Sequence, residues 1–206
     1  MSRDEFWRIS AENPDLRMER AANGELIVMT PTRGRSGPRN AEIIRQLGNW
    51  AVEDAKGTVL ESNSGCDLPD GSTLCPDTGW VSFSRWNPPA SEDEDAAIPC
   101  PEFVIELRSK TDRLHPLREK MQVWLANGCE LAWLIDPQRK AVEVYRPGRE
   151  PEVLEGASAV EGEGPVAGFV LELGKVWGLR GQRQPSNRCP HLFLPSRSQL
   201  QQSRFG

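Results

Sequence analysis

One apolar run with charges inside it constrains the fold of this chain more than any other feature. The stretch "FVIELRSKTDRL", residues 103–114, is rich in Phe, Val, Ile and Leu, yet it carries Glu106 and Arg108. Side chains alternate along a strand, so these two residues share one face, with α-carbons roughly 6–7 Å apart. Buried charge is costly unless something pairs with it. This strand face therefore needs a partner, a ligand or a metal ion.

A single α/β domain is the fold class that the surrounding pattern predicts. The chain has 206 residues, enough for one domain with a sizeable core. The predicted helices cover 3–13, 34–56 and 113–128, and the predicted strands lie in 16–31, 58–63, 66–72, 77–83, 103–108, 129–148 and 164–177. This order indicates one mixed β-sheet flanked by helices, with an N-terminal helix and a hairpin before it.

The C-terminal segment differs in composition from the rest of the chain. Residues 181–206 contain four arginines and no acid, and they show no usable periodicity. We therefore predict a domain over 1–178 and a disordered basic tail over 179–206. The acidic, Pro-rich run 87–99 is expected to be an exposed loop.

Charge and cysteine content limit the function classes. The net charge is −5, and the chain without residues 181–206 has 21 basic and 30 acidic residues. Such an acidic body matches nucleic acid poorly, so a polyanion would need divalent cations or a local basic patch. The chain has no apolar run of membrane-spanning length, and its first residues, with acids and no apolar core, are not expected to act as a secretory signal. Its five cysteines include no C-x-x-C pair, which is typical of reduced thiols in the cytoplasm.

A second carboxylate completes a candidate metal site. Asp77, in "CPDTGWV", stands at the start of a predicted strand, 29 residues before Glu106. That spacing allows neighbouring strands to bring both carboxylates to one end of the sheet. Oxygen ligands of this kind suit Mg²⁺ or Mn²⁺.

Longer stretches carry a family resemblance. "PD", a long loop and then "E-x-basic" resembles the PD-(D/E)XK nuclease superfamily. The stretches "NAEIIRQLGNWA", "LPDGSTLCPDTGWV", "PEFVIELRSKTDRLHPLREKMQVWLANG" and "LAWLIDPQRKAVEVYRPG" together resemble the Uma-type family of bacterial "putative restriction endonucleases". The resemblance covers about residues 3–178. It implies a restriction-endonuclease-like core, a divalent metal ion and DNA as the substrate, and it leaves a homodimer open.

The resemblance also implies roles for single residues. Asp77 and Glu106 match the two metal-binding acids, while Arg108 stands where the superfamily usually has lysine. Arg108 stays protonated, so it can orient a phosphate but cannot act as a base. Lys120, on the shoulder of the apolar face of the third helix, is expected to supply the missing lysine. Asn40, on the apolar face of the second helix, is expected to bind substrate.

Lys120 is the most specific of these expectations. A partly buried lysine can have a lowered pKa and take part in proton transfer, which arginine cannot. Lys120→Met is expected to abolish cleavage while leaving metal affinity and stability close to native. The simpler interpretation, which fits most lysines at such positions, is a boundary residue whose aliphatic stem covers apolar surface while its ammonium group reaches solvent.

Simpler interpretations exist for the other residues. Asp77 fits an Asx-turn at a strand entry, and Glu106 with Arg108 fits a structural ion pair. Asn40 fits a hydrogen-bonding residue at a helix entry. The alternative function is accordingly a catalytically inactive nuclease fold that serves as an interaction or nucleic-acid-binding module.

Overall fold

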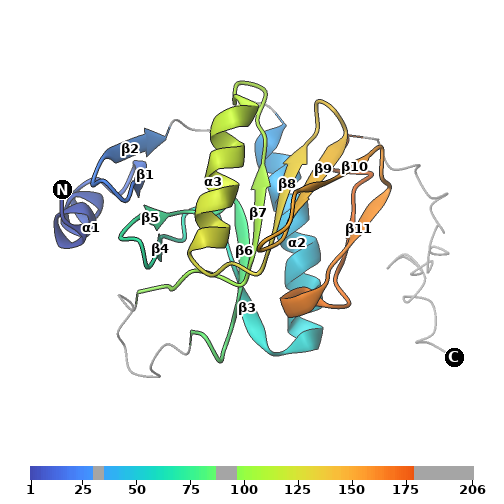
Figure 1. Ribbon diagram of the computed structural model, residues 1–206, viewed down its shortest axis with the longest axis horizontal. Helices are drawn as coiled ribbons and strands as arrows, with labels where there is room; N and C mark the ends of the chain where they lie inside the picture. The colour runs from blue at the N-terminus through green and yellow to red at the C-terminus, as the bar shows by residue number, and fades with distance from the viewer. Residues whose placement is uncertain (30–34, 87–96, 179–206) are drawn as a thin grey trace, which may run out of the picture.

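The elements of the chain are taken from a computed structural model that describes residues 1–29, 35–86 and 97–178 (Figure 1). The helices in this part are α1 (Arg3–Glu12), α2 (Ser36–Asp54) and α3 (Leu114–Ala126), with a 3₁₀ turn, η1 (Gly164–Val166). The strands are β1 (Arg17–Arg20), β2 (Leu26–Met29), β3 (Gly57–Leu60), β4 (Cys66–Asp67), β5 (Thr73–Leu74), β6 (Thr78–Ser82), β7 (Phe103–Leu107), β8 (Leu131–Asp136), β9 (Ala141–Tyr145), β10 (Glu152–Glu155), β11 (Ala159–Glu161) and β12 (Val170–Glu172). The predicted tail 179–206 and most of the predicted acidic loop lie outside the described residues.

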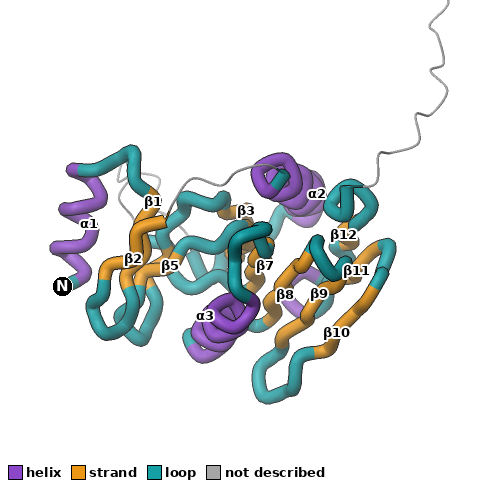
Figure 2. The backbone as a smooth tube through the Cα atoms, turned by 90° about the horizontal axis from the view of Figure 1, so that it is seen from above, coloured by secondary structure: helices purple, strands orange, loops and turns teal. Residues whose placement is uncertain are grey.

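A six-stranded mixed sheet forms the centre of the molecule, in the order β10-β9-β8-β7-β6-β3. Strands β7 and β8 run parallel, and the other neighbouring pairs run antiparallel. A parallel pair needs a crossover connection, which α3 supplies. Seen from above, α2 and α3 lie on opposite sides of this sheet (Figure 2). The predicted α/β class with a mixed, helix-flanked sheet is confirmed.

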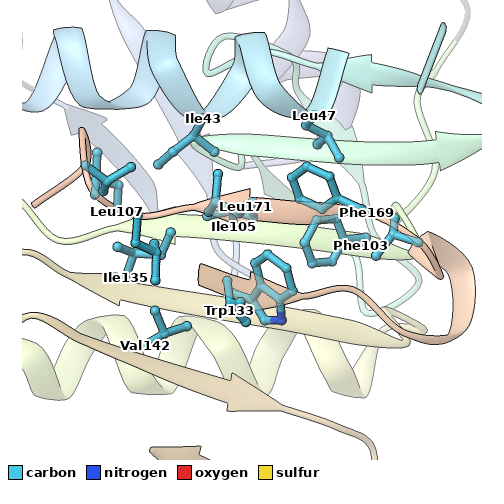
Figure 3. Close-up of a cluster of buried hydrophobic side chains, with 14 of the residues drawn as sticks. Ile43, Leu47, Phe103, Ile105, Leu107, Trp133, Ile135, Val142, Phe169 and Leu171 are labelled. Carbon is cyan, nitrogen blue, oxygen red and sulfur yellow. The ribbon is translucent and has the colours of Figure 1, made fainter. Parts of the chain in front are cut away.

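The central strands are buried on both faces, which explains their nearly continuous apolar sequence. Ile105 of β7 belongs to the core cluster on the α2 side, together with Ile43 (Figure 3). Val104 faces the other way and belongs to the cluster that contains Trp124 of α3. Because side chains alternate along β7, Glu106 lies on the α3 side as well.

The helix α2 covers its face of the sheet through residues spaced four apart. Ile43, Leu47 and Ala51 are buried, as expected for one stripe of an amphipathic helix. The chain then turns directly into β3 at Gly57. A Cβ atom at Gly57 would lie 2.5 Å from the ring of Trp80, so only glycine allows this close approach.

The N-terminal part forms a second sheet, which corrects the prediction of one sheet. Its order is β2-β1-β5-β4, and β1 meets β5 where Arg20 pairs with Thr73. The predicted hairpin around Asn23-Gly24 is present as β1-β2. The predicted strand over 66–72 is instead a short hairpin, β4-β5, because the chain turns at Gly71, which has a φ of 92°.

The C-terminal part adds strands that periodicity did not predict. The strand β10 extends the central sheet beside β9, and β11 pairs with β12 in a separate two-stranded sheet. The strand β10 is largely exposed, and β11 has three residues of which only Val160 is buried, so neither sequence contains an apolar run. Among the described helices, none has the length and apolar character needed to cross a membrane.

Candidate active site

Two carboxylates meet at one end of the central sheet. Asp77 directly precedes β6, which pairs antiparallel with β7 so that Thr78 lies opposite Ile105. Asp77 Oδ2 accepts a hydrogen bond of 2.9 Å from the backbone amide of Leu107, the residue after Glu106. The expectation that neighbouring strands bring Asp77 and Glu106 to the same end of the sheet is confirmed.

Glu106 is almost completely enclosed beneath α3, with an exposed fraction of 2%. Its Oε1 accepts a hydrogen bond of 2.9 Å from the indole N–H of Trp124 and lies 2.9 Å from Nζ of Lys120. The pKa of Glu106 is raised to about 7, mainly by burial; the charge of Lys120 counteracts this rise, and the charge of Asp77 adds to it. A carboxyl group in this setting is stabilised in its charged form by any cation placed beside it.

Lys120 fills the space between two buried carboxylates. Its Nζ contacts Glu19 Oε1 at 2.8 Å, the Cys75 carbonyl oxygen at 2.9 Å and Glu106 Oε1 at 2.9 Å. The contacts with Glu19 and Cys75 are hydrogen bonds, and the contact with Glu106 is an ion pair. Burial by itself lowers the pKa of Lys120, but Glu106 and Glu19 outweigh it and hold the pKa above its ordinary value. This direction is opposite to the lowered pKa that the sequence suggested for Lys120.

The strand β1 contributes a third acid and a second cation that sequence reasoning missed. Glu19 is buried, and its Oε1 also accepts the backbone N–H of Cys75 at 3.0 Å. Arg17 Nη2 donates to the Cys75 carbonyl at 3.2 Å, and Nη1 lies 3.5 Å from Asp77 Oδ1. The sequence pattern that could have indicated these residues is the one seen around Glu106. In "RMER", residues 17–20, charged side chains stand at alternate positions of a strand and therefore share one face.

Asn40 lies beside the site and uses both ends of its amide. Its Nδ2 donates to the backbone carbonyl of Asp77 at 2.8 Å, and its Oδ1 accepts from the hydroxyl of Thr78 at 3.0 Å. These bonds join α2 to the entry of β6 and hold the backbone from which the first carboxylate projects. Substrate binding by Asn40 stays a prediction.

The structure does not bring Arg108 into this cluster. The strand β7 ends at Leu107, which pairs in register with Ile135 of β8. The next residue of β8, Asp136, is buried and lies 2.7 Å from Arg108 Nη1, while Arg108 Nε donates to the Asp112 carbonyl at 3.2 Å. Arg108 thus leans toward the neighbouring strand, and its described contacts match the structural ion pair considered from the sequence, with Asp136 in place of Glu106.

The remaining carboxylate oxygens suit a hard divalent cation. Asp77 Oδ2 and Glu106 Oε1 are occupied by the bonds given above, whereas Asp77 Oδ1 has only its 3.5 Å contact with Arg17. No described residue donates to Glu106 Oε2. Within the described ranges, no group of three or more His, Cys, Asp and Glu side chains is placed to hold a metal ion. Mg²⁺ commonly binds one or two carboxylates and completes its shell with waters and phosphate oxygens, so this pair fits such an ion.

A groove lies on the other side of α3. It has a volume of about 820 Å³ and is lined by residues of α3 and of the β9–β10 region, among them Arg118, Glu143 and Tyr145. None of its lining residues belongs to the carboxylate cluster. The candidate active site is therefore the carboxylate cluster where β1, β6, β7 and α3 meet, and not this groove.

The fold of this chain is shared with a solved α/β protein. The crystal structure of a "putative nuclease belonging to DUF820" from Anabaena variabilis ATCC 29413 matches with a TM-score of 0.65 and 21% identity, over 78% of this chain and 89% of that chain. A cryo-EM structure of a DrdV–DNA complex matches with a TM-score of 0.38 and 17% identity, over 60% of this chain and 10% of that chain, which does not define a shared fold.

The family follows from the sequence match. The chain belongs to the Uma2 family, described as "Putative restriction endonuclease", whose model matches residues 3–174. The resemblance drawn from the motifs is confirmed. Among curated proteins, none matches the chain.

Proposed function

We propose that this protein is a Mg²⁺- or Mn²⁺-dependent nuclease that hydrolyses phosphodiester bonds of DNA. The observation that carries the proposal is the pair of carboxylates on neighbouring strands, Asp77 and Glu106, with Lys120 2.9 Å from the second acid. Membership of a family described as "Putative restriction endonuclease" supports the same reaction class.

Each residue of the cluster has a distinct part in this proposal. Asp77 Oδ1 and Glu106 Oε2 would hold the ion, which supplies an activated water molecule and neutralises charge on the phosphate. Lys120 fixes the orientation of Glu106 and keeps positive charge at the site. Asn40 holds the backbone at Asp77. A divalent ion also offsets the net charge of −5 as DNA approaches.

The contacts that Lys120 already makes within the protein favour a second candidate function. An ammonium group that already joins Glu19 and Glu106 is also what an inactive, purely structural charge network contains. In that case the protein would be an interaction or nucleic-acid-binding module on a nuclease fold. Metal binding distinguishes the two candidates.

The first experiment measures the melting temperature with and without Mn²⁺ for the native protein, Asp77→Asn and the control Glu12→Gln on α1. A ligand that binds only the folded state at about 100 times its Kd stabilises by about 2.7 kcal/mol. We expect Mn²⁺ to raise the melting temperature of the native protein and the control, and not that of Asp77→Asn. Equal shifts in all three proteins would contradict a shared metal site.

The second experiment measures cleavage of supercoiled plasmid with Mg²⁺ or Mn²⁺, with and without a chelator. We expect nicking that requires the metal ion and that Glu106→Gln reduces to background. Metal binding without cleavage of DNA or RNA would support the inactive module instead.

A further inference from the structure

Arg17 is the more exposed of the two cations in the carboxylate cluster. Its side chain is 22% exposed, compared with 16% for Lys120 and 3% for Glu106. The guanidinium lies 3.5 Å from Asp77 Oδ1, the carboxylate oxygen available to a metal ion. The Asp77 side chain is 21% exposed, so a group that entered from solvent would meet Arg17 and Asp77 before Lys120 and Glu106.

The N–H donors of Arg17 form longer hydrogen bonds within the protein than those of Lys120. Its contacts with Asp77 and the Cys75 carbonyl are 3.5 and 3.2 Å long, and its Nε is buried without a hydrogen-bond partner among the described residues. Lys120, in contrast, has two hydrogen bonds and one ion pair, all at 2.8–2.9 Å. An unpaired buried donor costs free energy, which a ligand oxygen can recover.

Arginine is also the side chain whose shape suits a phosphate group. Its planar fork presents N–H donors that bind two oxygens of a tetrahedral anion at once. The Arg108 guanidinium cannot take this part from its present position, because Asp136 and the Asp112 carbonyl hold it. Arg17, from the separate N-terminal sheet, lies beside Asp77 and could take the phosphate-orienting role that the sequence analysis gave to Arg108.

We propose that Arg17 is a catalytic residue that binds a non-bridging oxygen of the scissile phosphate, beside the metal ion held by Asp77 and Glu106. This inference rests on the proposed nuclease function. On phosphate binding, Arg17 exchanges its long contact with Asp77 for the phosphate oxygen and leaves Asp77 Oδ1 to the metal ion. The guanidinium then faces the negative charge that develops on the phosphate in the transition state.

The test compares Arg17→Gln and Arg17→Lys with the native protein. The control is Arg8→Gln, which removes the same charge from an exposed position on α1 whose ion pair is with Glu12. Binding of a short DNA duplex is measured over a series of NaCl concentrations in Ca²⁺ buffer, and cleavage is measured separately with Mg²⁺. Thermal melting of each variant shows that it is folded under the assay conditions.

Loss of one phosphate contact is expected to reduce the salt-dependence slope of binding by about 1. Cleavage by Arg17→Gln is expected to fall by about 10²–10³-fold, the effect of removing one preorganised donor from a reacting oxyanion. Arg17→Lys is expected to recover the slope and part of the rate, and Arg8→Gln to behave as native. A native slope and rate in folded Arg17→Gln would overturn the inference.

The outcomes separate this inference from the proposed function. A slope that depends on Arg17 in a native protein that never cleaves would keep the phosphate contact and overturn the nuclease. Cleavage that requires Asp77 and Glu106 but not Arg17 would keep the nuclease and overturn the contact. If Arg17→Gln melts at a much lower temperature and Arg17→Lys restores melting but not the slope, Arg17 is a structural partner of Asp77 only.

Discussion

Lys120 balances one positive charge against two buried carboxylates. Its contacts with Glu19 and Glu106 are both below 3 Å, and the two acids have side chains that are 6% and 3% exposed. Removing one partner of a buried ionic group leaves the remaining charges without compensation. The sequence-based expectation that Lys120→Met stays close to native stability therefore does not fit the structure.

We expect Lys120→Met to lower the free energy of unfolding by about 3–5 kcal/mol, the cost typical of breaking a buried ion pair. The double variant Lys120→Met/Glu19→Gln should recover part of this loss, because one unpaired charge is removed with it. Lys56→Met, which changes an exposed lysine, should stay within about 0.5 kcal/mol of native. Urea unfolding measures all three. If Lys120→Met unfolds at the native urea concentration, the charge cluster does not contribute to stability.

How far single residues could be predicted depended on local pattern. Asp77 and Glu106 stand out because each is a charged residue next to apolar strand sequence. Lys120 follows from helical spacing, since one face of α3 must cover the sheet. Glu19 and Arg17 could not be placed in this way, because nothing local shows which face of the hairpin turns toward a helix about a hundred residues later.

The helix α3 is fastened to the sheet at a second point, on the side away from the carboxylate cluster. Arg118 donates to both carboxylate oxygens of Glu143 on β9, at 2.9 and 2.5 Å, and the Tyr145 hydroxyl donates to the same group at 2.8 Å. Burial by itself raises the pKa of Glu143, but these hydrogen bonds outweigh it and hold the pKa below its usual value. Ionised Glu143 therefore ties the helix to β9.

A lowered carboxyl pKa gives stability a definite pH dependence. The contribution is fully present above the unfolded-state pKa, about 4.3 for glutamate, and is lost as pH falls through the lower pKa of the folded state. We expect Glu143→Gln to lose about 1–3 kcal/mol at neutral pH. The difference from native should shrink as pH falls below about 4.

Urea unfolding at neutral and acidic pH measures this difference. The control is Glu155→Gln, because Glu155 is exposed and pairs with an exposed arginine. Its effect should stay near zero at both pH values. If Glu143→Gln loses as much free energy of unfolding in acid as at neutral pH, the packing of the Glu143 side chain, and not its charge, stabilises the protein.

At the level of elements, the long periodic segments were predictable and the short exposed ones were not. The helices α2 and α3 and the strands β7 to β9 follow from period and burial, since each must cover or fill the core. The hairpin β4-β5 joined a different sheet, and neither the exposed strand β10 nor the three-residue strand β11 gave an apolar signal. Their positions depend on pairing with distant strands, which local sequence does not encode.

The whole molecule closes its core with the segment after β11. Phe169, Leu171, Leu173 and Val176 are buried in the cluster on the α2 side of the sheet. The indole N–H of Trp177 donates to the Ala157 carbonyl at 2.8 Å. Among the described residues, Trp177 is the last that packs into this cluster, and the domain boundary at residue 178 stays a prediction.

Truncation tests that boundary. A chain ending at Gly178 is expected to keep the native unfolding midpoint, because the removed sequence lacks the periodicity that would bury it. A chain ending at Gly168 should lose most of its stability, since each large buried side chain removed contributes about 1.5–3 kcal/mol. Thermal and urea unfolding measure both. A large loss on truncation at Gly178 would show that the removed residues contribute packing of their own.

The bond between Glu19 and Lys120 limits how this chain can be divided into a portable module. A fragment starting at α2 would retain the whole central sheet, both metal-binding candidates and Lys120. It would leave the ammonium without one of its two carboxylates, and the backbone amide of Cys75 without its acceptor. The β1-β2 hairpin that precedes α2 is thus a required part of the site. A fragment or gene fusion that is meant to keep the site intact must include this hairpin.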